Sequence, residues 1–173
     1  EPRVKSVVLA GTPASWMDVI ASGTQPYPMR SIVGPALGDP RVDAMHPLLS
    51  IGQGVVDDTE PTVHARWLVG NGTPRDVLLV HGADDAHVGA TSQEAISRVL
   101  RAGALTANGA TAPSSLQSVN APISGNVQGR TVVASFRPGA DPHRLLLQDA
   151  DTQVQVRTFL STRVLDGVAT VPE

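Results

Sequence analysis

Three short apolar runs place the strongest constraint on how this chain can fold. They cover residues 4–10 (VKSVVLA), 77–81 (VLLVH) and 131–136 (TVVASF), and each is rich in β-branched residues. An unbroken apolar run of this length, bounded by turn residues, is typical of a strand that is buried on both faces of a parallel sheet. The sequence therefore predicts three strands of one parallel sheet.

Helical patterns follow the second and the third run. Residues 91–102 carry apolar side chains at helical spacing, with Thr91 or Ser92 available as the N-cap. Residues 149–165 repeat the pattern, with an apolar face formed by Val154, Val156, Phe159, Leu160 and Val164. Strands that alternate with helices indicate an α/β fold, a mostly parallel sheet with flanking helices.

Two segments interrupt this alternation. Residues 13–75 hold eight of the fourteen prolines, which predicts loops and short helices that form a cap or lid over one end of the sheet. Residues 103–129 are small, polar and nearly uncharged, which predicts an excursion loop or a hairpin. A sheet that begins near Val4 with no helix before it would leave one edge unpaired, so the predicted sheet is incomplete without a preceding segment.

Composition excludes several classes of function. Hydrophobic residues make up 41% of the 173 residues and charged residues 17%, as in a globular protein. The formal net charge of −3 gives no reason to expect binding to nucleic acid, which usually calls for a basic face. The absence of cysteine excludes disulfides, thiolate metal sites and a cysteine nucleophile within the chain. No apolar run approaches the roughly 20 residues of a membrane span.

Polar residues follow the end of each predicted strand. They are Gly11-Thr12, then the acidic turn Asp84-Asp85-Ala86-His87, then Asp141-Pro142-His143. Ligands of open α/β sheets bind at the carboxyl ends of the strands. An acid after one strand and a histidine after the next supply two members of a nucleophilic triad, in the chain order of α/β-hydrolases.

The acidic turn and the histidine turn resemble those of the α/β-hydrolase superfamily. In DVLLVHGADDAHVGATSQEAISRVLRA, the residues Gly82, Asp85 and Val88 fill the family pattern Gly-x-x-Asp-x-x-Val. The stretch ASFRPGADPHRLLLQDADTQVQVRTFL is similar to the last strand, histidine loop and terminal helix of that family. The resemblance implies that Asp85 is the triad acid and His143 the triad histidine.

Two further stretches carry the same resemblance. VKSVVLAGTPAS is similar to the strand that follows the nucleophile helix, and HPLLSIGQGVVDDTEPTVHARWL resembles the cap of bacterial secreted lipase- or esterase-like hydrolases. The resemblance implies that residues 1–173 are the C-terminal part of one α/β-hydrolase domain, secreted or located in the cell envelope. It implies hydrolysis of an ester or lipid, with no cofactor, no metal and no membrane contact except through the substrate.

The nucleophile of that family has no counterpart in the chain. The family's serine lies on a Gly-x-Ser-x-Gly turn, and the flanking glycines are missing from Ser15, Ser92, Ser115 and Ser124. In family order this turn precedes the strand that begins here at Val4. We therefore expect the serine on a preceding segment or on a separate companion chain. A non-catalytic binding or structural subunit with the same fold, and a peptidase or other acyl hydrolase, are the alternatives.

Each site residue also has a structural interpretation. Asp85 can form a turn after Gly82 or cap the next helix, and His143 can pack in its loop. Asp84 can be a solvated neighbour or, alternatively, the acid itself. A metal site would draw on four possible ligands, His81, Asp84, Asp85 and His87. His81 ends a buried strand, however, and should point away from the turn.

A substrate pocket is expected under the cap. Trp16, Met17 and Trp67 lie in the predicted cap and are apolar enough to line an acyl pocket, with His87 at its mouth. The alternative is that the three cap residues pack beneath the lid.

Overall fold

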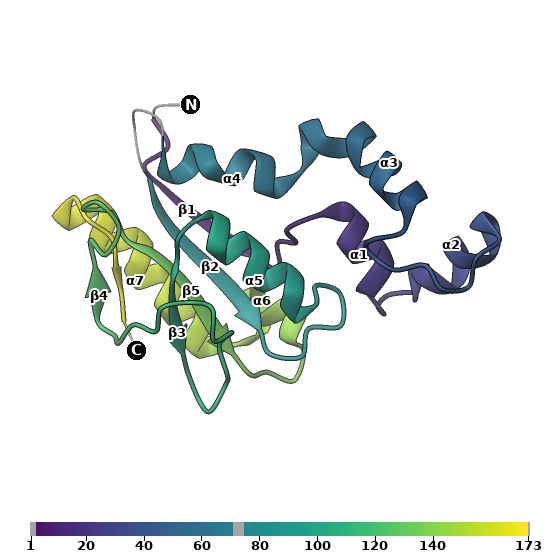
Figure 1. Cartoon of the computed structure of the whole chain (residues 1–173). Helices are drawn as coiled ribbons and strands as arrows, with labels where there is room; N and C mark the ends of the chain where they lie inside the picture. The colour runs from purple at the N-terminus through teal and green to yellow at the C-terminus, as the bar shows by residue number, and fades with distance from the viewer. Residues whose placement is uncertain (1–2, 71–74, 173) are drawn as a thin grey trace.

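A four-stranded parallel sheet forms the centre of the molecule (Figure 1). The computed structural model describes residues 3–70 and 75–172. The strand order is β1–β2–β5–β3, and the strands are β1 (Ser6–Ala10), β2 (Asp76–Gly82), β3 (Gly103–Thr106) and β5 (Val132–Arg137). The predicted parallel sheet is confirmed, since β1, β2 and β5 correspond to the three apolar runs.

The pair of central strands is buried along its whole length. β2 and β5 are in parallel register from Val77 opposite Val132 to Gly82 opposite Arg137. At the amino end of this pair, the fully buried Asp76 carboxylate accepts a 2.7 Å hydrogen bond from the backbone N–H of Thr131. β1 lies at the edge of the sheet, and all five of its residues are only half-buried.

The segment 103–129 differs from the predicted loop or hairpin. Its first residues form β3, which pairs in parallel with β5 and completes the sheet. Residues Ile123–Ser124 form a short strand, β4, that pairs antiparallel with β6 (Thr170–Val171) near the end of the chain. The prediction failed here because GALT is short and contains a glycine, so it lacks the β-branched run that identified the other strands.

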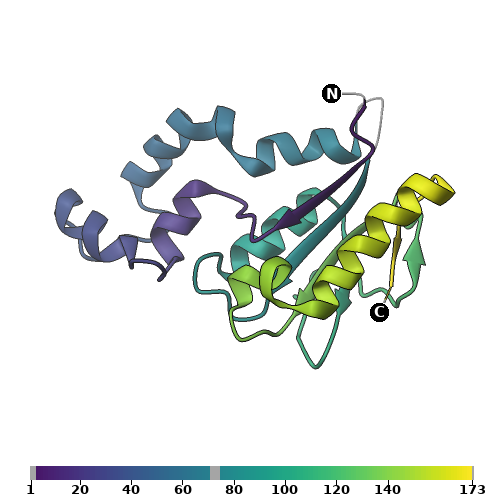
Figure 2. The ribbon, with the colours of Figure 1, turned by 180° about the vertical axis from the view of Figure 1, so that it is seen from behind.

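Helices cover both faces of the sheet (Figures 1 and 2). One face packs against α5 (Ala90–Val99), whose fully buried Ile96 contributes to the core on that side. The other face packs against α7 (Ala150–Asp166), whose fully buried Phe159 contributes to the second core. The predicted α/β architecture with flanking helices is therefore present.

Both flanking helices differ in detail from their predictions. Neither Thr91 nor Ser92 caps α5; Gly89 precedes it, and the Ser92 hydroxyl instead accepts a 2.8 Å hydrogen bond from the backbone N–H of Ala14. On α7, Thr152 and Gln155 are buried, whereas the expected core residues Val154 and Val164 are exposed. Tertiary contacts thus override the apolar periodicity of this helix.

Residues 13–75 form short helices, as predicted for the described part of this segment. The helices are α1 (Trp16–Ser22), α2 (Met29–Leu37), α3 (Pro47–Val56), the 3-10 helix η1 (Asp57–Thr59) and α4 (Pro61–Val69). α1 to α3 project to one side of the sheet and share a small core of their own, whereas α4 returns to pack against α5 and β2 (Figures 1 and 2). In the described ranges, no helix combines the length and the apolar character that crossing a bilayer requires.

We expect Phe159→Ala to lower the free energy of unfolding by about 3–5 kcal/mol, because it removes a fully buried ring from the α7 core. Val164→Ala, on the same helix but 82% exposed, should change it by less than about 0.5 kcal/mol. Urea denaturation followed by circular dichroism measures both. Equal effects of the two substitutions would contradict the assigned face of α7.

Candidate acid–histidine site

The turn after β2 holds Asp85 in a fixed orientation. Its Oδ1 accepts hydrogen bonds from the backbone N–H groups of His87, at 2.8 Å, and Val88, at 3.1 Å. The side chain of Asp85 is fully buried, and so is nearly all of Val88. The carboxylate is therefore aimed by its own turn, with Oδ2 left for another partner.

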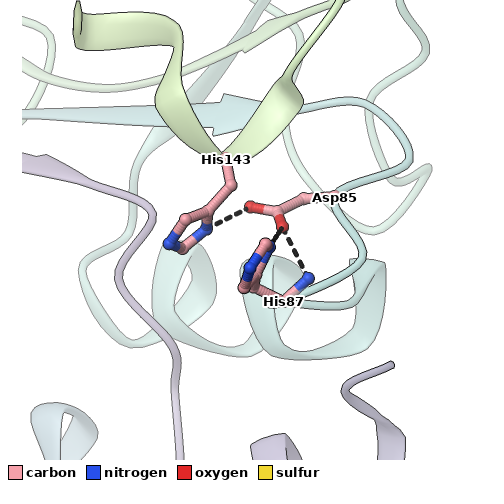
Figure 3. Close-up of side chains that lie close together, drawn as sticks. All are labelled: Asp85, His87 and His143. Atoms are coloured by element: carbon pink, nitrogen blue, oxygen red, sulfur yellow. Dashed lines mark hydrogen bonds and ion pairs between the residues drawn. The ribbon is translucent and has the colours of Figure 1, made fainter. Parts of the chain in front are cut away.

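His143 supplies that partner from the turn after β5. It lies in the short 3-10 helix η2 (Pro142–Arg144), which leads into α6 (Leu145–Gln148). Its Nδ1 is 3.0 Å from Oδ2 of Asp85, as Figure 3 shows. The structure thus brings together Asp85 and His143, which lie 58 residues apart in the sequence.

This hydrogen bond determines the tautomer of the neutral His143 imidazole. An ionised carboxylate only accepts, so Nδ1 of His143 carries the proton and donates the hydrogen bond to Asp85. In neutral His143, Nε2 is then an unprotonated acceptor. It points away from Asp85 (Figure 3), and none of the described residues forms a hydrogen bond with it. The His143 side chain is 32% exposed, so the imidazole is open to a further group.

Two glycines set the position of the histidine turn. Gly82 ends β2 directly beneath Pro142, and a Cβ at position 82 would overlap the Pro142 backbone carbonyl. Gly11 follows β1 with a φ of +58°, and a Cβ there would lie 3.0 Å from Cε1 of His143. His143 therefore occupies the carboxyl ends of β1 and β2, and only residues without a side chain leave it room.

His87 contacts both members of the pair. Its ring stacks on that of His143, with 4.1 Å between ring centroids and 23° between ring planes. Its Nδ1 lies 3.6 Å from Oδ1 of Asp85. The sequence suggested that His87 lines a pocket mouth or serves as one of four possible metal ligands. Its stacking on His143 has no sequence signal, because it depends on how two turns approach each other.

The segment 13–75 also touches the acidic turn. The backbone N–H of Thr24, just after α1, donates a 2.8 Å hydrogen bond to the carbonyl of Ala86, and that of Gln25 donates to the same oxygen. The helices beyond β1 are therefore connected to the turn that carries Asp85.

Asp84 and His81 lie apart from the pair. The Asp84 side chain is exposed, and its φ of +60° places it at the tip of the turn. His81 is fully buried and points away from the turn, as expected. Because the hydroxyl of Ser97 donates to the carbonyl of Gln93, its oxygen accepts the Nε2–H of His81 at 3.0 Å. The four possible metal ligands named from the sequence, His81, Asp84, Asp85 and His87, therefore do not lie together around one point.

A different trio has the chemistry of a metal site. One ligand atom each of Asp85, His87 and His143 lies within 4.8 Å of the others, and two imidazoles with a carboxylate are suitable ligands for zinc or iron. An ion bound through Nδ1 of His143 would displace the hydrogen bond of that nitrogen to Asp85.

The residues expected to line an acyl pocket are not gathered in one place. Met17 lies against the small core of α1 to α3 and lines a hollow of about 280 Å³. Trp67 lines a different hollow, of about 470 Å³, beside Val4. Trp16 is 45% exposed, and its indole N–H donates to the carbonyl of Thr59. Only His87 lies at the acid–histidine pair.

The serines considered as nucleophiles have local roles. Ser15 caps α1 and donates to Gln53, and Ser92 accepts from Ala14. Ser115 forms a hydrogen bond with Glu94, and Ser124 lies in β4. None of these four hydroxyls forms a hydrogen bond with His143.

Comparison of the chain with protein-family models, with curated protein sequences and with solved structures gives no match.

The chain alone should show a slowly exchanging proton on Nδ1 of His143. A hydrogen bond to a buried carboxylate protects this proton and moves its NMR signal downfield of the backbone amides. We expect the signal in the unaltered chain and in Asp84→Asn, the matched exposed neighbour, and its loss in Asp85→Ala and in His143→Gln. A signal that survives in Asp85→Ala would contradict the pairing.

Protonation of His81 should couple stability to pH. Desolvation by burial lowers its pKa to about 4, and the nearby charge of Asp85 only partly opposes this; the unfolded chain has a pKa of about 6.5. The unfolded state therefore binds more protons between these values. The free energy of unfolding should fall by up to about 1.4 kcal/mol per pH unit as the pH drops from 6.5 to 4.

Urea denaturation at a series of pH values measures this effect. His81→Gln should flatten the dependence in that window, whereas His64→Gln, which alters an exposed histidine, should leave it unchanged. Parallel curves for His81→Gln and the unaltered chain would show that His81 is not the group responsible.

Proposed function

We propose that this chain is part of a carboxylic ester hydrolase, lipase- or esterase-like, with an α/β-hydrolase-like fold. Asp85 and His143 are two members of its catalytic triad, and the serine lies on a preceding segment or a companion chain. The observation that carries the proposal is the 3.0 Å hydrogen bond from Nδ1 of His143 to the buried Asp85. It lies at the carboxyl end of a parallel sheet, where such folds bind ligands.

The proposed chemistry begins at Nε2 of His143. The serine hydroxyl attacks the ester carbonyl carbon while Nε2 takes its proton. The buried Asp85 carboxylate stabilises the resulting imidazolium through Nδ1–H. The imidazolium then protonates the alkoxide leaving group, and an acyl-enzyme remains.

Deacylation uses the same two residues. Nε2 removes a proton from water as the water attacks the acyl-enzyme, and His143 returns that proton to the serine as the carboxylic acid leaves. His143 and Asp85 end in their starting states, so the cycle requires no metal and no cofactor.

The edge strand β1 supports the proposed position of the serine. Its five residues are only half-buried, and it pairs on one side with β2. A further parallel strand added to the free side would have its carboxyl end beside Gly11, whose Cα lies close to the ring of His143. A serine on the turn after that strand would approach Nε2.

The surface of the helical segment supports an ester or lipid as substrate. Leu48, Ile51 and Val55 are exposed at helical spacing on α3, which gives this segment an apolar face. We propose a secreted or cell-envelope location on the resemblance to bacterial secreted hydrolases. Contact with a membrane surface would arise only through the substrate, and we expect no nucleic acid as partner.

Two alternatives use the same site. A peptidase or other acyl hydrolase would have the same acid–histidine pair, because the fold does not determine the substrate. A non-catalytic binding or structural subunit would retain the pair without turnover. The position of Nε2, hydrogen-bonded to none of the described residues, favours a catalytic use over the latter.

The test uses this chain together with the segment or chain that carries the serine. Asp85→Asn and His143→Ala should each lower kcat/KM for a p-nitrophenyl ester by at least about 10³-fold, because each removes a member of the proton-transfer pair. Labelling of the serine by a fluorophosphonate probe should slow in parallel. Asp84→Asn, which alters the adjacent exposed carboxylate, should change kcat/KM by less than about threefold.

Urea midpoints of the variants separate loss of activity from loss of folding. If Asp85→Asn and His143→Ala fold normally and retain ester turnover and labelling, the triad assignment is wrong. If the unaltered assembly neither hydrolyses esters nor reacts with the probe but cleaves peptides, the peptidase alternative replaces the proposal. An assembly that does none of these would be a non-catalytic subunit.

A further inference from the structure

Arg137, the last residue of β5, is a buried cation that lacks a strong partner. Its side chain is 4% exposed, and it follows Val133 and Ser135 on the face of the sheet that α7 covers. Its Nε is buried and has no hydrogen-bond partner among the residues that the structure describes. A buried guanidinium with unused donors is costly unless a negative group comes within reach.

The carboxylate nearest to Arg137 is that of Asp149, and its hydrogen bonds go to Thr152. Oδ2 of Asp149 lies 3.9 Å from a terminal nitrogen of Arg137, which is too far for a hydrogen bond. The same oxygen accepts hydrogen bonds from the backbone N–H of Thr152, at 2.7 Å, and from its hydroxyl, at 2.6 Å. Asp149 thus caps α7 and provides Arg137 with only a distant charge.

Arg137 lines a hollow of about 600 Å³ at the carboxyl ends of β3 and β5. This volume is within the range of small-molecule sites. The lining residues that bear on the argument are the apolar Leu105, Val119 and Val154 and the polar Asn120 and Asp151. The hollow lies on the β3 side of the sheet, whereas His143 lies at β1 and β2, so the two are separate sites.

We propose that this hollow binds a small aliphatic monocarboxylic acid, with the carboxylate on Arg137 and the chain against Leu105, Val119 and Val154. The planar guanidinium matches a carboxylate in shape and charge. A phosphate monoester fits less well, because Asp149 and Asp151 at the same end of the sheet would repel a dianion. A neutral ligand would leave the buried charge uncompensated.

Isothermal titration calorimetry of the chain with hexanoate tests the proposal. We expect saturable binding at one site, at least tenfold weaker binding of hexanamide, which lacks the charge, and no saturable binding of inorganic phosphate. This readout requires no ester turnover, so it can fail or succeed independently of the proposed hydrolase activity.

Two variants and a matched control locate the site. Arg137→Gln should weaken hexanoate binding at least tenfold. Val154→Glu places a negative charge on the wall of the hollow at a position that is 54% exposed, so it should weaken binding similarly without disturbing the fold. Val164→Glu, on the same helix and 82% exposed, should bind hexanoate like the unaltered chain.

Three results would overturn the proposal. The unaltered chain could fail to bind hexanoate saturably, in which case Arg137 serves only to pair with Asp149. Val154→Glu, whose urea midpoint confirms folding, could bind hexanoate as tightly as the unaltered chain. Phosphate or hexanamide could bind as tightly as hexanoate, in which case the site does not select a monocarboxylate.

Discussion

The parallel pairing of β2 with β5 is the interaction on which the rest of the molecule depends. Six opposed residue pairs, all buried, fix the two strands relative to each other, and Asp76 anchors their amino ends by accepting from the backbone of Thr131. Because the register is fixed, both strands end at the same level. The acidic turn and the histidine turn therefore start from neighbouring points, and their side chains meet although 58 residues separate Asp85 from His143.

The sequence predicts the parts of this arrangement that depend on local chemistry. Apolar β-branched runs identified β1, β2 and β5, because a strand buried on both faces needs them. β3 was missed, since its four residues include a glycine and are held in place by pairing with β5 and by backbone hydrogen bonds of Ala104 to Gln117 and Val119. On α7, the hydroxyl of the buried Thr152 donates to Asp149, and the side-chain amide of the buried Gln155 donates to the carbonyl of Pro172. Because these hydrogen bonds allow polar side chains to be buried, the polar residues of this helix could not be assigned to its exposed face from the sequence.

The candidate site, like the fold, could be predicted where it depends on local sequence. The spacing of Gly82, Asp85 and Val88 favoured Asp85 over Asp84, and only Asp85 contacts His143. The backbone N–H of Val88 donates to Asp85, which gives that spacing a physical reason. The stacking of His87 on His143 and the weak pairing of Arg137 depend on distances between elements, which no local pattern encodes. The expected acyl pocket was not found as one hollow for the same reason, since Met17 and Trp67 belong to helices that run in different parts of the molecule.

The crossing of Pro142 over Gly82 has a consequence for how this region can vary in evolution. The carbonyl of Pro142 occupies the space that a side chain at position 82 would need. A substitution at position 82 would therefore require a compensating change in the histidine turn, whereas Ala86, exposed at the tip of the turn, can change independently. Asp84 is exposed as well, but its φ of +60° restricts position 84 to residues that tolerate a left-handed backbone, such as Asp, Asn and Gly. Within a stretch of five residues, selection should hold positions 82 and 85 constant, limit position 84 to Asp, Asn or Gly, and leave position 86 free.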